Sequence, residues 1–359
     1  MKSIVYVRGS EIKDVRLQKF LNYFVEKKFD ITFWGWSRLN EKKEKEGVTS
    51  EYLLSGGGYG NKSKLFLYYF FWVFVVFWKC IKTNLREKIV IAIDFDSALP
   101  VYLASKFKRI TYLYEVYDDF ALRYKFPTFV KRIVHRMDTK IMKRSHCVIH
   151  VDNNRVLFKD CKWIVIENTP TDIFNGKVRN YKEIEPLFAV IGYMSKQRGL
   201  VPILEFIKKN PGLRFLVVGR FIDEEERNKF KAQPNVEYYD YMLQPELFEK
   251  MRRCCAIFSL YDPSVDINRL AASNKVYDAM MFGIPVITNK EVINSGFIKE
   301  KDLGFVIDYD YNDTWACLTD KNFMKEVETK GKKGRELYLN EYQFSELVNK
   351  RLEPILNAL

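Results

Sequence analysis

Short apolar runs alternate along this chain with longer segments that carry apolar residues at helical spacing. Such alternation is typical of parallel sheets whose strands are joined by helices. The stretch 38–61 breaks the pattern, because it is charged and then glycine-rich, and we expect a mobile loop there. In the first half the pattern predicts strands at 2–7, 30–36, 88–94, 110–116, 146–151 and 163–167, and helices at 13–27, 63–82, 97–106, 127–144 and 152–160.

A second alternating series follows residue 186. The stretch 169–185, with Pro170, Gly176 and several charges, is interpreted as an interdomain linker. Amphipathic helices complete the chain from about residue 323. The second series predicts strands at 187–193, 213–219, 236–241, 256–260, 286–289 and 304–307.

The two series predict an α/β fold with two doubly wound parallel-sheet (Rossmann-like) domains facing a cleft. A chain of 359 residues can give each domain its own core. The predicted domains are 1–168 and 186–340, and a C-terminal helix at 341–359 is expected to pack back on the first. Ligands of such sheets bind beyond the carboxyl ends of the strands, so we expect a ligand in the cleft.

The positive charge of the chain lies entirely in its first half. Residues 1–170 hold 31 Lys and Arg against 18 Asp and Glu, whereas residues 171–359 hold 28 of each. A field of this kind favours an anionic partner such as a membrane surface or a lipid phosphate. Nucleic acid is not expected as a partner, because no recognised reading motif is present and the charge coincides with an apolar helix.

The most apolar stretch is Leu65–Trp78, fourteen apolar or aromatic residues between Lys64 and Lys79. A spanning helix needs roughly 20 such residues, so this run is too short to cross a membrane. It is also too apolar all round for an ordinary surface helix. Two interpretations stay open: a helix buried under the sheet, or one that projects aromatic side chains into a lipid interface while lysines meet the headgroups.

Cysteine and histidine usage indicates no disulfide framework and no metal site. The six cysteines show no Cys-x-x-Cys spacing, and the three histidines form no ligand pattern with them. The chain begins with Met1-Lys2 and runs directly into a predicted strand, without a secretory signal. We therefore expect free thiols in a reducing cytoplasm.

The segment 273–288 predicts a short helix followed directly by a buried strand. Ser273 or Asn274 can cap the helix, and Gly283 suits the left-handed position after its last turn. The free N–H groups of a helix start, with Lys275 beside them, are a good seat for a diphosphate. Asp278 lies one turn further, where its carboxylate can accept hydrogen bonds from the hydroxyls of a ribose.

This segment resembles the donor-binding motif of bacterial retaining glycosyltransferases of the GT-B fold, the large group called family 4. Asp278 stands where that group usually has glutamate, and Asn274 where proline is frequent. Weaker similarities follow in the order and spacing of the family, and together they span most of the chain: Asp14-Val15-Arg16, Tyr114–Asp119, Val165–Pro170 and the loop Gly192–Gly199.

The resemblance implies that the second domain binds a nucleotide-sugar and the first binds an acceptor, without a metal and without a cofactor. Arg198 stands where the family usually has lysine, and Tyr117 where many members have histidine. The paired acid that many relatives carry is absent, since Leu270 occupies the position eight before Asp278. The predicted site consists of Tyr117, Asp118 and Asp119 for catalysis, Gly192, Arg198, Ser273, Asn274 and Lys275 for the donor diphosphate, Asp278 for the ribose, and Gly9, Ser10 and Asp266 for the donor sugar or acceptor.

These observations predict a cytoplasmic glycosyltransferase, peripherally associated with the inner face of the membrane. We expect transfer from a nucleotide-diphosphate sugar, with UDP favoured over GDP, to a saccharide acceptor that is lipid-linked and serves bacterial surface-polysaccharide assembly. Retention of stereochemistry is implied by the resemblance alone. Two alternatives stay open: a non-catalytic partner subunit with the same fold, and a GT-B sugar-nucleotide epimerase.

Overall fold

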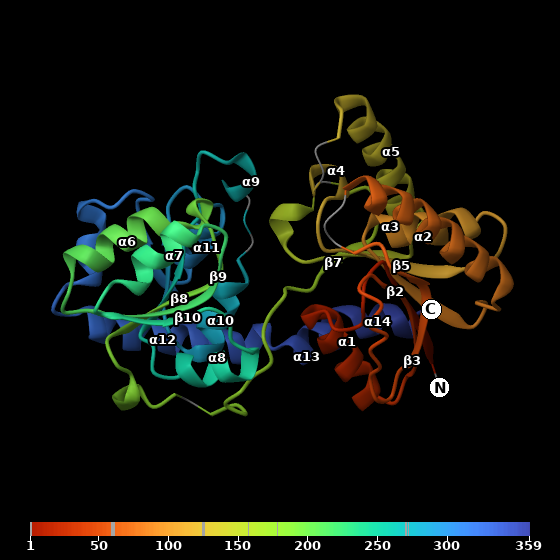
Figure 1. Cartoon of the computed structure of the whole chain (residues 1–359). Helices are drawn as coiled ribbons and strands as arrows, with labels where there is room; N and C mark the ends of the chain where they lie inside the picture. The colour runs from red at the N-terminus through yellow and green to blue at the C-terminus, as the bar shows by residue number, and fades with distance from the viewer. Residues whose placement is uncertain are drawn as a thin grey trace. The chain divides into compact units, whose positions relative to one another are not determined.

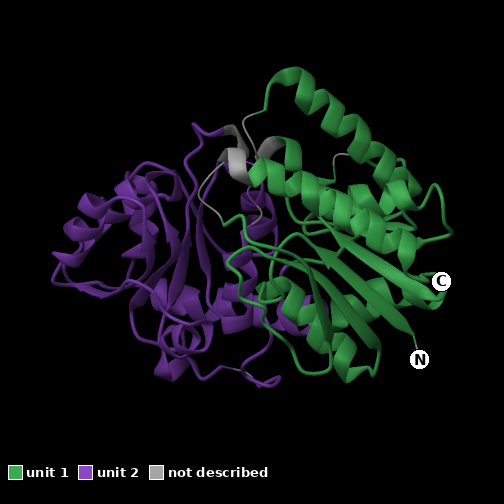
Figure 2. Ribbon diagram, turned by 45° about the vertical axis from the view of Figure 1, so that its right-hand side comes forward, with its two compact units in different colours: residues 1–167, 344–359 green, residues 168–343 purple. Residues whose placement is uncertain are grey.

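The computed structural model describes residues 2–58, 62–123, 126–156, 158–177, 179–269, 271 and 273–359. It divides into two compact units, each built around its own parallel sheet. Unit 1 consists of residues 1–167 together with 344–359, and unit 2 consists of residues 168–343 (Figure 2). The predicted fold class, α/β with two doubly wound parallel sheets, is confirmed.

Unit 1 contains a seven-stranded sheet with the order β3-β2-β1-β4-β5-β6-β7, and every neighbouring pair in it is parallel. Each predicted strand of the first half is present to within about two residues at either end. The strands are β1 (Ser3–Arg8), β2 (Asp30–Ser37), β3 (Thr49–Ser55), β4 (Lys88–Ile93), β5 (Thr111–Val116), β6 (Cys147–His150) and β7 (Trp163–Val165).

Helices cover both faces of this sheet, because successive residues of each strand point to opposite faces. One face packs against α1 (Val15–Glu26) and against the C-terminal segment, and the other packs against α2, α3 and α5 (Figure 1). The remaining helical bounds are α2 (Lys62–Lys82), α3 (Phe95–Ala104), α4 (Phe120–Arg123), α5 (Thr128–Arg144), α13 (Phe344–Leu347), the π-helical turn Val348–Leu352 and α14 (Glu353–Asn357).

Two of the elements expected in unit 1 were predicted wrongly. The stretch 38–61, expected to be a mobile loop, contains strand β3, which pairs with β2 at the edge of the sheet. Its residues are mostly half-buried, and an edge strand of this kind carries no strong apolar signal. The helix expected at 152–160 is reduced to a single 3₁₀ turn at Asn153–Arg155.

Unit 2 contains a six-stranded sheet with the order β10-β9-β8-β11-β12-β13, again entirely parallel. All six strands were predicted. They are β8 (Leu187–Met194), β9 (Arg214–Phe221), β10 (Val236–Tyr239), β11 (Ala256–Ser259), β12 (Val286–Asn289) and β13 (Gly304–Ile307). The helices are α6 (Leu200–Lys209), α7 (Glu224–Lys231), α8 (Gln244–Met251), α9 (Asp266–Arg269), α10 (Asn274–Phe282), α11 (Asn294–Glu300) and α12 (Phe323–Leu337).

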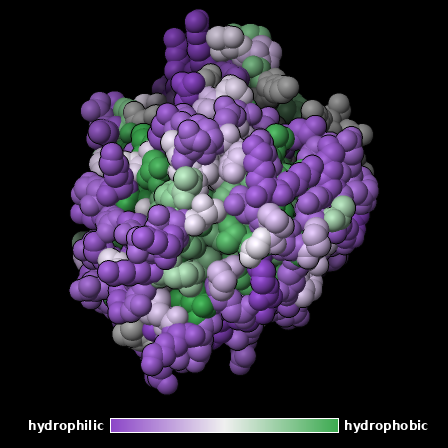
Figure 3. All heavy atoms as spheres, turned by 90° about the vertical axis from the view of Figure 1, so that its left-hand side faces the viewer, coloured by the Kyte–Doolittle hydropathy of each residue, from purple (hydrophilic) through white to green (hydrophobic). Residues whose placement is uncertain are grey.

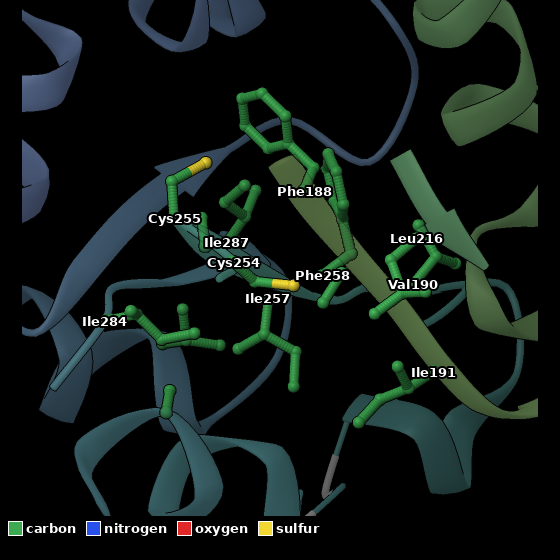
Figure 4. Close-up of a cluster of buried hydrophobic side chains, with 14 of the residues drawn as sticks. Phe188, Val190, Ile191, Leu216, Cys254, Cys255, Ile257, Phe258, Ile284 and Ile287 are labelled. Atoms are coloured by element: carbon green, nitrogen blue, oxygen red, sulfur yellow. The ribbon is translucent and has the colours of Figure 1, made fainter. Parts of the chain in front are cut away.

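The core of unit 2 forms where apolar side chains of its central strands meet the helices. Phe188 of β8 and Phe258 of β11 lie on one side of the sheet with their ring centroids 5.9 Å apart, and Ile191 and Ile257 point to the other side (Figure 4). Cys254 and Cys255 are buried there as free thiols. On the side of the molecule that Figure 3 shows, hydrophilic side chains dominate and hydrophobic ones gather in the middle of the view.

The segment 169–185, expected to be a linker, belongs to unit 2 and packs onto it. Buried Arg179 donates hydrogen bonds to the carbonyls of Phe282, Arg252 and Cys254. The Tyr181 hydroxyl donates to the carbonyl of Gly283 at 2.9 Å. The chain returns to unit 1 at Phe344, and the side chains of Phe344, Leu347 and Leu352 then join the core that contains α1.

Both sheets reverse their winding direction at one point. In unit 1 the reversal lies between β1 and β4, and in unit 2 it lies between β8 and β11. At such a point the connections leave to opposite faces of the sheet, so the carboxyl ends of the two strands border a crevice that can bind a ligand. The candidate site residues of each unit are therefore expected at these two strand pairs.

Candidate functional site

The candidate donor site of unit 2 begins at the N-terminus of α10. Ser273 is the N-cap residue, and Gly283 ends the helix in the left-handed conformation with φ +64°, as predicted. The Ser273 side chain does not cap the helix. Its hydroxyl is turned inward and accepts a hydrogen bond from Ser259 at 2.8 Å. The first-turn N–H groups of α10 are therefore not capped by that hydroxyl, and Asn274 at the first helical position is exposed.

Lys275 lies over the carboxyl end of β8. A Cβ atom added at Gly192 would be 3.8 Å from Lys275 Nζ. Gly192 has φ +104°, a conformation that other residues adopt only with strain. The lysine ammonium, an exposed glycine backbone and the start of a helix thus meet at the winding reversal, which is a suitable arrangement for a phosphate group.

Arg198 is held at the same edge by an aromatic ring. Its guanidinium lies 4.5 Å from the centre of the Tyr261 ring, and Tyr261 lies two residues beyond the end of β11. Gly199, with φ +76°, turns the chain from Arg198 into α6, and a Cβ there would come within 2.5 Å of the Leu260 side chain. The sequence signal for Arg198 and Lys275 therefore corresponds to two cations on one edge of the unit 2 sheet.

Tyr261 is a site residue that the sequence prediction missed. It is 5% exposed, and its backbone is fixed by a pair of hydrogen bonds with the side chain of Asn289. Burial would raise the pKa of Tyr261, but the charges of Lys275 and Arg198, with hydrogen bonds to Ser273 and Ser259, hold this pKa below its usual value. Both predicted phosphate-binding cations are therefore close enough to Tyr261 to affect its pKa electrostatically.

Two further predicted residues of unit 2 are placed as follows. Asp278 lies half-buried on α10, one turn beyond Asn274. Burial is the main cause that raises the pKa of Tyr338, and the nearby charge of Asp278 also raises it. Asp266 begins the short helix α9, and its side chain lies outside the described part of the structure. Leu270, at the position of the missing second acid, also lies outside it.

Unit 1 has a polar cavity of about 260 Å³ at its own winding reversal. Gly9 and Ser10, predicted to approach the donor sugar or acceptor, both line it. The sequence prediction missed its other lining residues. These are Arg8, Glu11, Lys13, Asp14, Arg38, Tyr69, Ile93, Asp94 and Asp96.

The Gly9 loop in this cavity is fixed from two sides. Its N–H donates to the Ser97 hydroxyl at 3.1 Å, and its carbonyl accepts from Arg38 Nε at 2.9 Å. Arg38 in turn donates to the Tyr69 hydroxyl of α2 at 3.0 Å. A Cβ at Gly9 would lie 2.3 Å from a carboxylate oxygen of Asp96, so a larger residue there would require the Asp96 side chain to move.

Asp94 adopts a strained backbone conformation at the rim of the cavity. Its φ of +61° and ψ of 165° belong to a region that is essentially restricted to glycine. Its carboxylate accepts hydrogen bonds from the backbone N–H of Tyr117 at 2.9 Å and of Asp118 at 3.5 Å. Strain of this kind persists where the surroundings enforce it, and it concentrates at functional sites.

The three residues predicted to be catalytic lie beside this cavity but do not line it. Asp118 is exposed and pairs with Arg155 at 3.1 Å. The Asp119 carboxylate accepts from the N–H of Ala121 at the start of α4. The Tyr117 ring lies 4.4 Å from the guanidinium of Arg8, and burial, with the nearby Glu115 charge, raises the pKa of Tyr117 well above its usual value.

The missed cavity residues carried a partial signal in the sequence. Asp94 and Asp96 follow the buried strand β4, the position at which ligand-binding side chains of parallel sheets occur. Arg38 gave no such signal, because it stands in a charged stretch that resembles a loop. Its place in the cavity depends on β2 lying next to β1, which the sequence alone does not state.

Comparison with known proteins identifies the fold. No protein-family model matches the chain, and no curated protein sequence matches it. Solved structures do: the chain has the GT-B fold of glycosyltransferases with two parallel sheets. These similarities, all below 15% sequence identity, concern the fold.

Three of these solved structures match the chain over nearly its whole length. Sucrose-phosphate synthase from Thermosynechococcus elongatus has a TM-score of 0.75 and 11% identity, and the match covers 100% of each chain. HepE from Anabaena in complex with UDP has a TM-score of 0.71 and 13% identity, also over 100% of each chain. WaaG, a glycosyltransferase involved in lipopolysaccharide biosynthesis, has a TM-score of 0.66 and 12% identity over 98% of this chain and 99% of that one.

Proposed function

We propose that this protein is a glycosyltransferase that moves a sugar from a nucleotide-diphosphate donor to a saccharide acceptor. The observation that carries this proposal is the meeting of Lys275, Arg198 and the start of α10 at the winding reversal of unit 2. Two cations and a helix N-terminus suit the charge that develops on a departing diphosphate.

UDP is the favoured nucleotide. Two similar solved structures contain it or a derivative: HepE in complex with UDP, and a trehalose-6-phosphate protein from E. coli bound with UDP-2-fluoro glucose. In the proposed complex the diphosphate contacts Arg198 and Lys275, with backbone N–H groups of Gly192, Ser273 and Asn274 nearby. The Asp278 carboxylate accepts hydrogen bonds from the ribose. GDP is the alternative nucleotide.

Unit 1 is proposed to bind the acceptor. Its cavity is lined by arginine and carboxylate side chains together, and such a mixture of donors and acceptors suits the hydroxyl groups of a saccharide. Asp96 lies against Gly9, and Asp94 lies at the rim of the cavity. Both join Asp118, Asp119 and Tyr117 as candidates to orient the acceptor. Transfer is proposed to proceed with retention, without a metal ion or other cofactor.

The cellular setting is proposed to be the inner face of a bacterial membrane, with a lipid-linked acceptor in surface-polysaccharide assembly. The excess of basic residues in the first 170 residues supports this setting, because it favours an anionic surface. Unit 1 would then be the membrane-facing, acceptor-binding unit, and unit 2 the nucleotide-sugar-binding unit.

Calorimetric titration with UDP, GDP, ADP and CMP tests the donor site. We expect selective binding of one nucleoside diphosphate, and a loss of about tenfold or more in Asp278→Ala if a charged hydrogen bond to ribose is removed. Glu246→Ala is the matched control, since it removes an exposed acid from another helix of unit 2. Absence of binding to all four nucleotides by a folded protein would contradict the proposal and favour a non-catalytic subunit.

A second measurement separates transfer from epimerisation. An epimerase would convert or hydrolyse a bound nucleotide-sugar without any saccharide acceptor. Incubation of the donor with and without acceptor, followed by separation of the sugar products, should show consumption of donor only with acceptor. Rapid acceptor-independent turnover would contradict the transferase assignment while leaving the donor site intact.

A further inference from the structure

Helix α2 carries a continuous row of exposed aromatic side chains, which we call the aromatic stripe: Phe66, Phe70, Phe74 and Trp78. These residues are spaced by four, so they lie along one side of the helix. Their exposed fractions are 70%, 66%, 54% and 44%. So much aromatic surface facing outward on one helix indicates a surface that is covered in the functional state.

The opposite side of α2 is part of the core of unit 1. Trp72, Val76 and Cys80 repeat at the same spacing and are completely buried against the sheet and α3. The helix has 21 residues and is about 31 Å long, so by length and composition it could cross a membrane. The expectation that this segment is too short to cross a membrane was therefore wrong. The packing of α2 against the core indicates that it lies along unit 1.

The layer that contains α2 is basic as well as apolar. Helices α2, α3 and α5 lie together on one side of the sheet (Figures 1 and 2). Their ranges hold ten Lys and Arg but only two acids, Asp96 and Asp138. Asp96 is buried, and Asp138 is turned inward, where it accepts a hydrogen bond from the Tyr114 hydroxyl at 2.7 Å.

Further exposed apolar residues lie at the other two helices of this layer. Phe107, just beyond α3, is 74% exposed and its ring contacts that of Phe77 on α2. On α5, Phe129 and Ile133 are 65% and 56% exposed, and they alternate with basic residues such as Arg132 and Arg136. Lys79 pairs with Glu51 and Lys143 with Asp160, so part of this charge is neutralised by acids outside the three helices. The combination of aromatic rings with the remaining excess of positive charge is complementary to the headgroup region of an anionic bilayer.

We infer that unit 1 binds an anionic membrane through this layer, with α2 lying in the plane of the interface. The aromatic stripe enters the boundary between headgroups and acyl chains, and the basic residues of α5 contact lipid phosphates. The helix does not cross the membrane, because its other side holds the core of unit 1 together.

This inference deepens the proposed function, on which its last step rests. Tyr69, on the same helix as the stripe, lines the unit 1 cavity and bonds to Arg38 there. The cavity thus lies about one helix diameter, roughly 10 Å, from the aromatic stripe. A saccharide attached to a lipid can span this distance while its lipid stays in the bilayer, so the arrangement favours a membrane-borne acceptor.

Flotation of the full chain with lipid vesicles tests the inference without donor or acceptor. We expect binding to vesicles of phosphatidylcholine and phosphatidylglycerol in equal parts, and weak binding to phosphatidylcholine alone. Phe70→Ser combined with Phe74→Ser should weaken binding by about tenfold or more, since two aromatic rings no longer leave water. The matched control is Tyr241→Ser with Leu243→Ser, which removes two comparably exposed apolar side chains from unit 2.

The contribution of charge is tested separately. Arg132→Glu with Arg136→Glu should weaken binding to the anionic vesicles by about tenfold, whereas Lys321→Glu with Lys325→Glu, an equal charge change in unit 2, should have a much smaller effect. Thermal unfolding of each variant establishes that it is folded. Equal vesicle binding by the wild type and the stripe variant would overturn the inference.

Two other outcomes would also overturn it. Retention of the protein in vesicles after alkaline carbonate extraction would show a spanning helix rather than an interfacial one. A dimer in the absence of lipid that the stripe variant converts to a monomer, without vesicle binding by either, would identify a second copy as the occupant of this face. Neither result depends on catalysis, so a failure here is distinguishable from a failure of the proposed function.

Discussion

The guanidinium of Arg198 lies over the ring of Tyr261, 4.5 Å from its centre, at the carboxyl edge of the unit 2 sheet. Arg198 comes from the turn after β8, and Tyr261 comes from the end of β11, the two strands at the winding reversal. Contact with an aromatic face restricts an arginine side chain while leaving its N–H groups able to bind an anion. Tyr261 therefore positions a cation of the candidate donor site.

We predict that the ring, and not the hydroxyl, of Tyr261 supports nucleotide binding. Tyr261→Leu should weaken binding of the preferred nucleoside diphosphate by about 5- to 30-fold, the range expected for loss of a partly desolvated cation–π contact of about 1–2 kcal/mol. Tyr261→Phe keeps the ring and should change the Kd by less than about threefold. Calorimetry measures both, and equal losses in the two variants would contradict a positioning role of the ring.

The strained backbone of Asp94 predicts an unusual preference for glycine. Both Asp94→Gly and Asp94→Ala remove the carboxylate that accepts from Tyr117 and Asp118, so their difference isolates the backbone. At φ +61° and ψ 165° we expect the glycine variant to be more stable than the alanine variant by about 1–3 kcal/mol. Urea unfolding measures this difference.

The matched control for Asp94 is Asp96, two residues later in the first turn of α3. There the backbone is helical, so the order should reverse, and alanine should be more stable than glycine by up to about 1 kcal/mol. An alanine variant at position 94 that is as stable as the glycine variant, or more stable, would show that Asp94 is not strained.

The sequence predicted the strands and helices well wherever apolar periodicity was strong. In segment 273–288, the cap position of Ser273, the left-handed Gly283 and the strand from Val286 are all as predicted. Strand β3 was missed because it pairs along one side only and its residues, Thr49–Ser55, are mostly half-buried. The pattern of apolar residues indicates which side chains are buried, and an edge strand buries few of them.

The candidate site was only partly predictable, for a different reason. Ser273, Asn274, Lys275 and Asp278 come from one compact motif, so their proximity follows from helix geometry. Gly192 and Arg198 join them only because β8 lies next to β11. The unit 1 cavity combines Gly9, Arg38 and Asp94, which are brought together by the order of strands β2, β1 and β4. The periodicity of apolar residues along the chain does not indicate the order of the strands in the sheet. The predicted roles of Tyr117, Asp118 and Asp119 remain predictions.

Buried His150 predicts a specific loss of stability in mild acid. The residue is 2% exposed, both ring nitrogens lack a hydrogen-bond partner, and burial lowers its pKa to about 4. Because the unfolded chain binds a proton near pH 6.5 and the folded chain does not, the contribution of His150 is complete above that pH and is lost as the pH falls toward 4. The expected loss is about 3 kcal/mol between these limits.

His150→Leu should remove this part of the pH dependence. The free energy of unfolding is measured with urea at pH 7 and at about pH 4.5, which lies in the lower part of the His150 titration range. The difference between the two pH values should be smaller for the variant than for the wild type. Leucine also removes two unpaired buried nitrogens, so stability at pH 7 should not fall for lack of hydrogen bonds. His135→Leu replaces a histidine of α5 whose side chain is 47% exposed, and it is the matched control for the loss of an imidazole outside the core. An unchanged slope in His150→Leu would be inconsistent with a buried neutral imidazole.

The ion pair between Arg335 and Asp172 should be among the most sensitive positions of unit 2. Arg335 is 2% exposed, and its guanidinium contacts both carboxylate oxygens of Asp172, at 2.8 and 2.9 Å. It also donates to the carbonyls of Met281 and Lys177, and so ties α12 to α10 and to the segment before β8. Removing one partner leaves the other charge buried without compensation. We therefore expect Arg335→Ala to lower the free energy of unfolding by about 3–5 kcal/mol.

The matched control lies one turn earlier on the same helix. Lys332 forms an exposed pair with Glu328, and Lys332→Ala should cost no more than about 0.5 kcal/mol. The pH dependence gives a second check, because burial would raise the pKa of Asp172 but Arg335 and the N–H groups of Gly176 and Phe174 hold it below its usual value. The stabilisation is then present above the unfolded pKa of about 3.9 and is lost as the pH falls below it. The difference in stability between wild type and Asp172→Asn should therefore shrink below about pH 4, and a difference that stays constant down to about pH 2 would show that the charge of Asp172 is not what stabilises this contact.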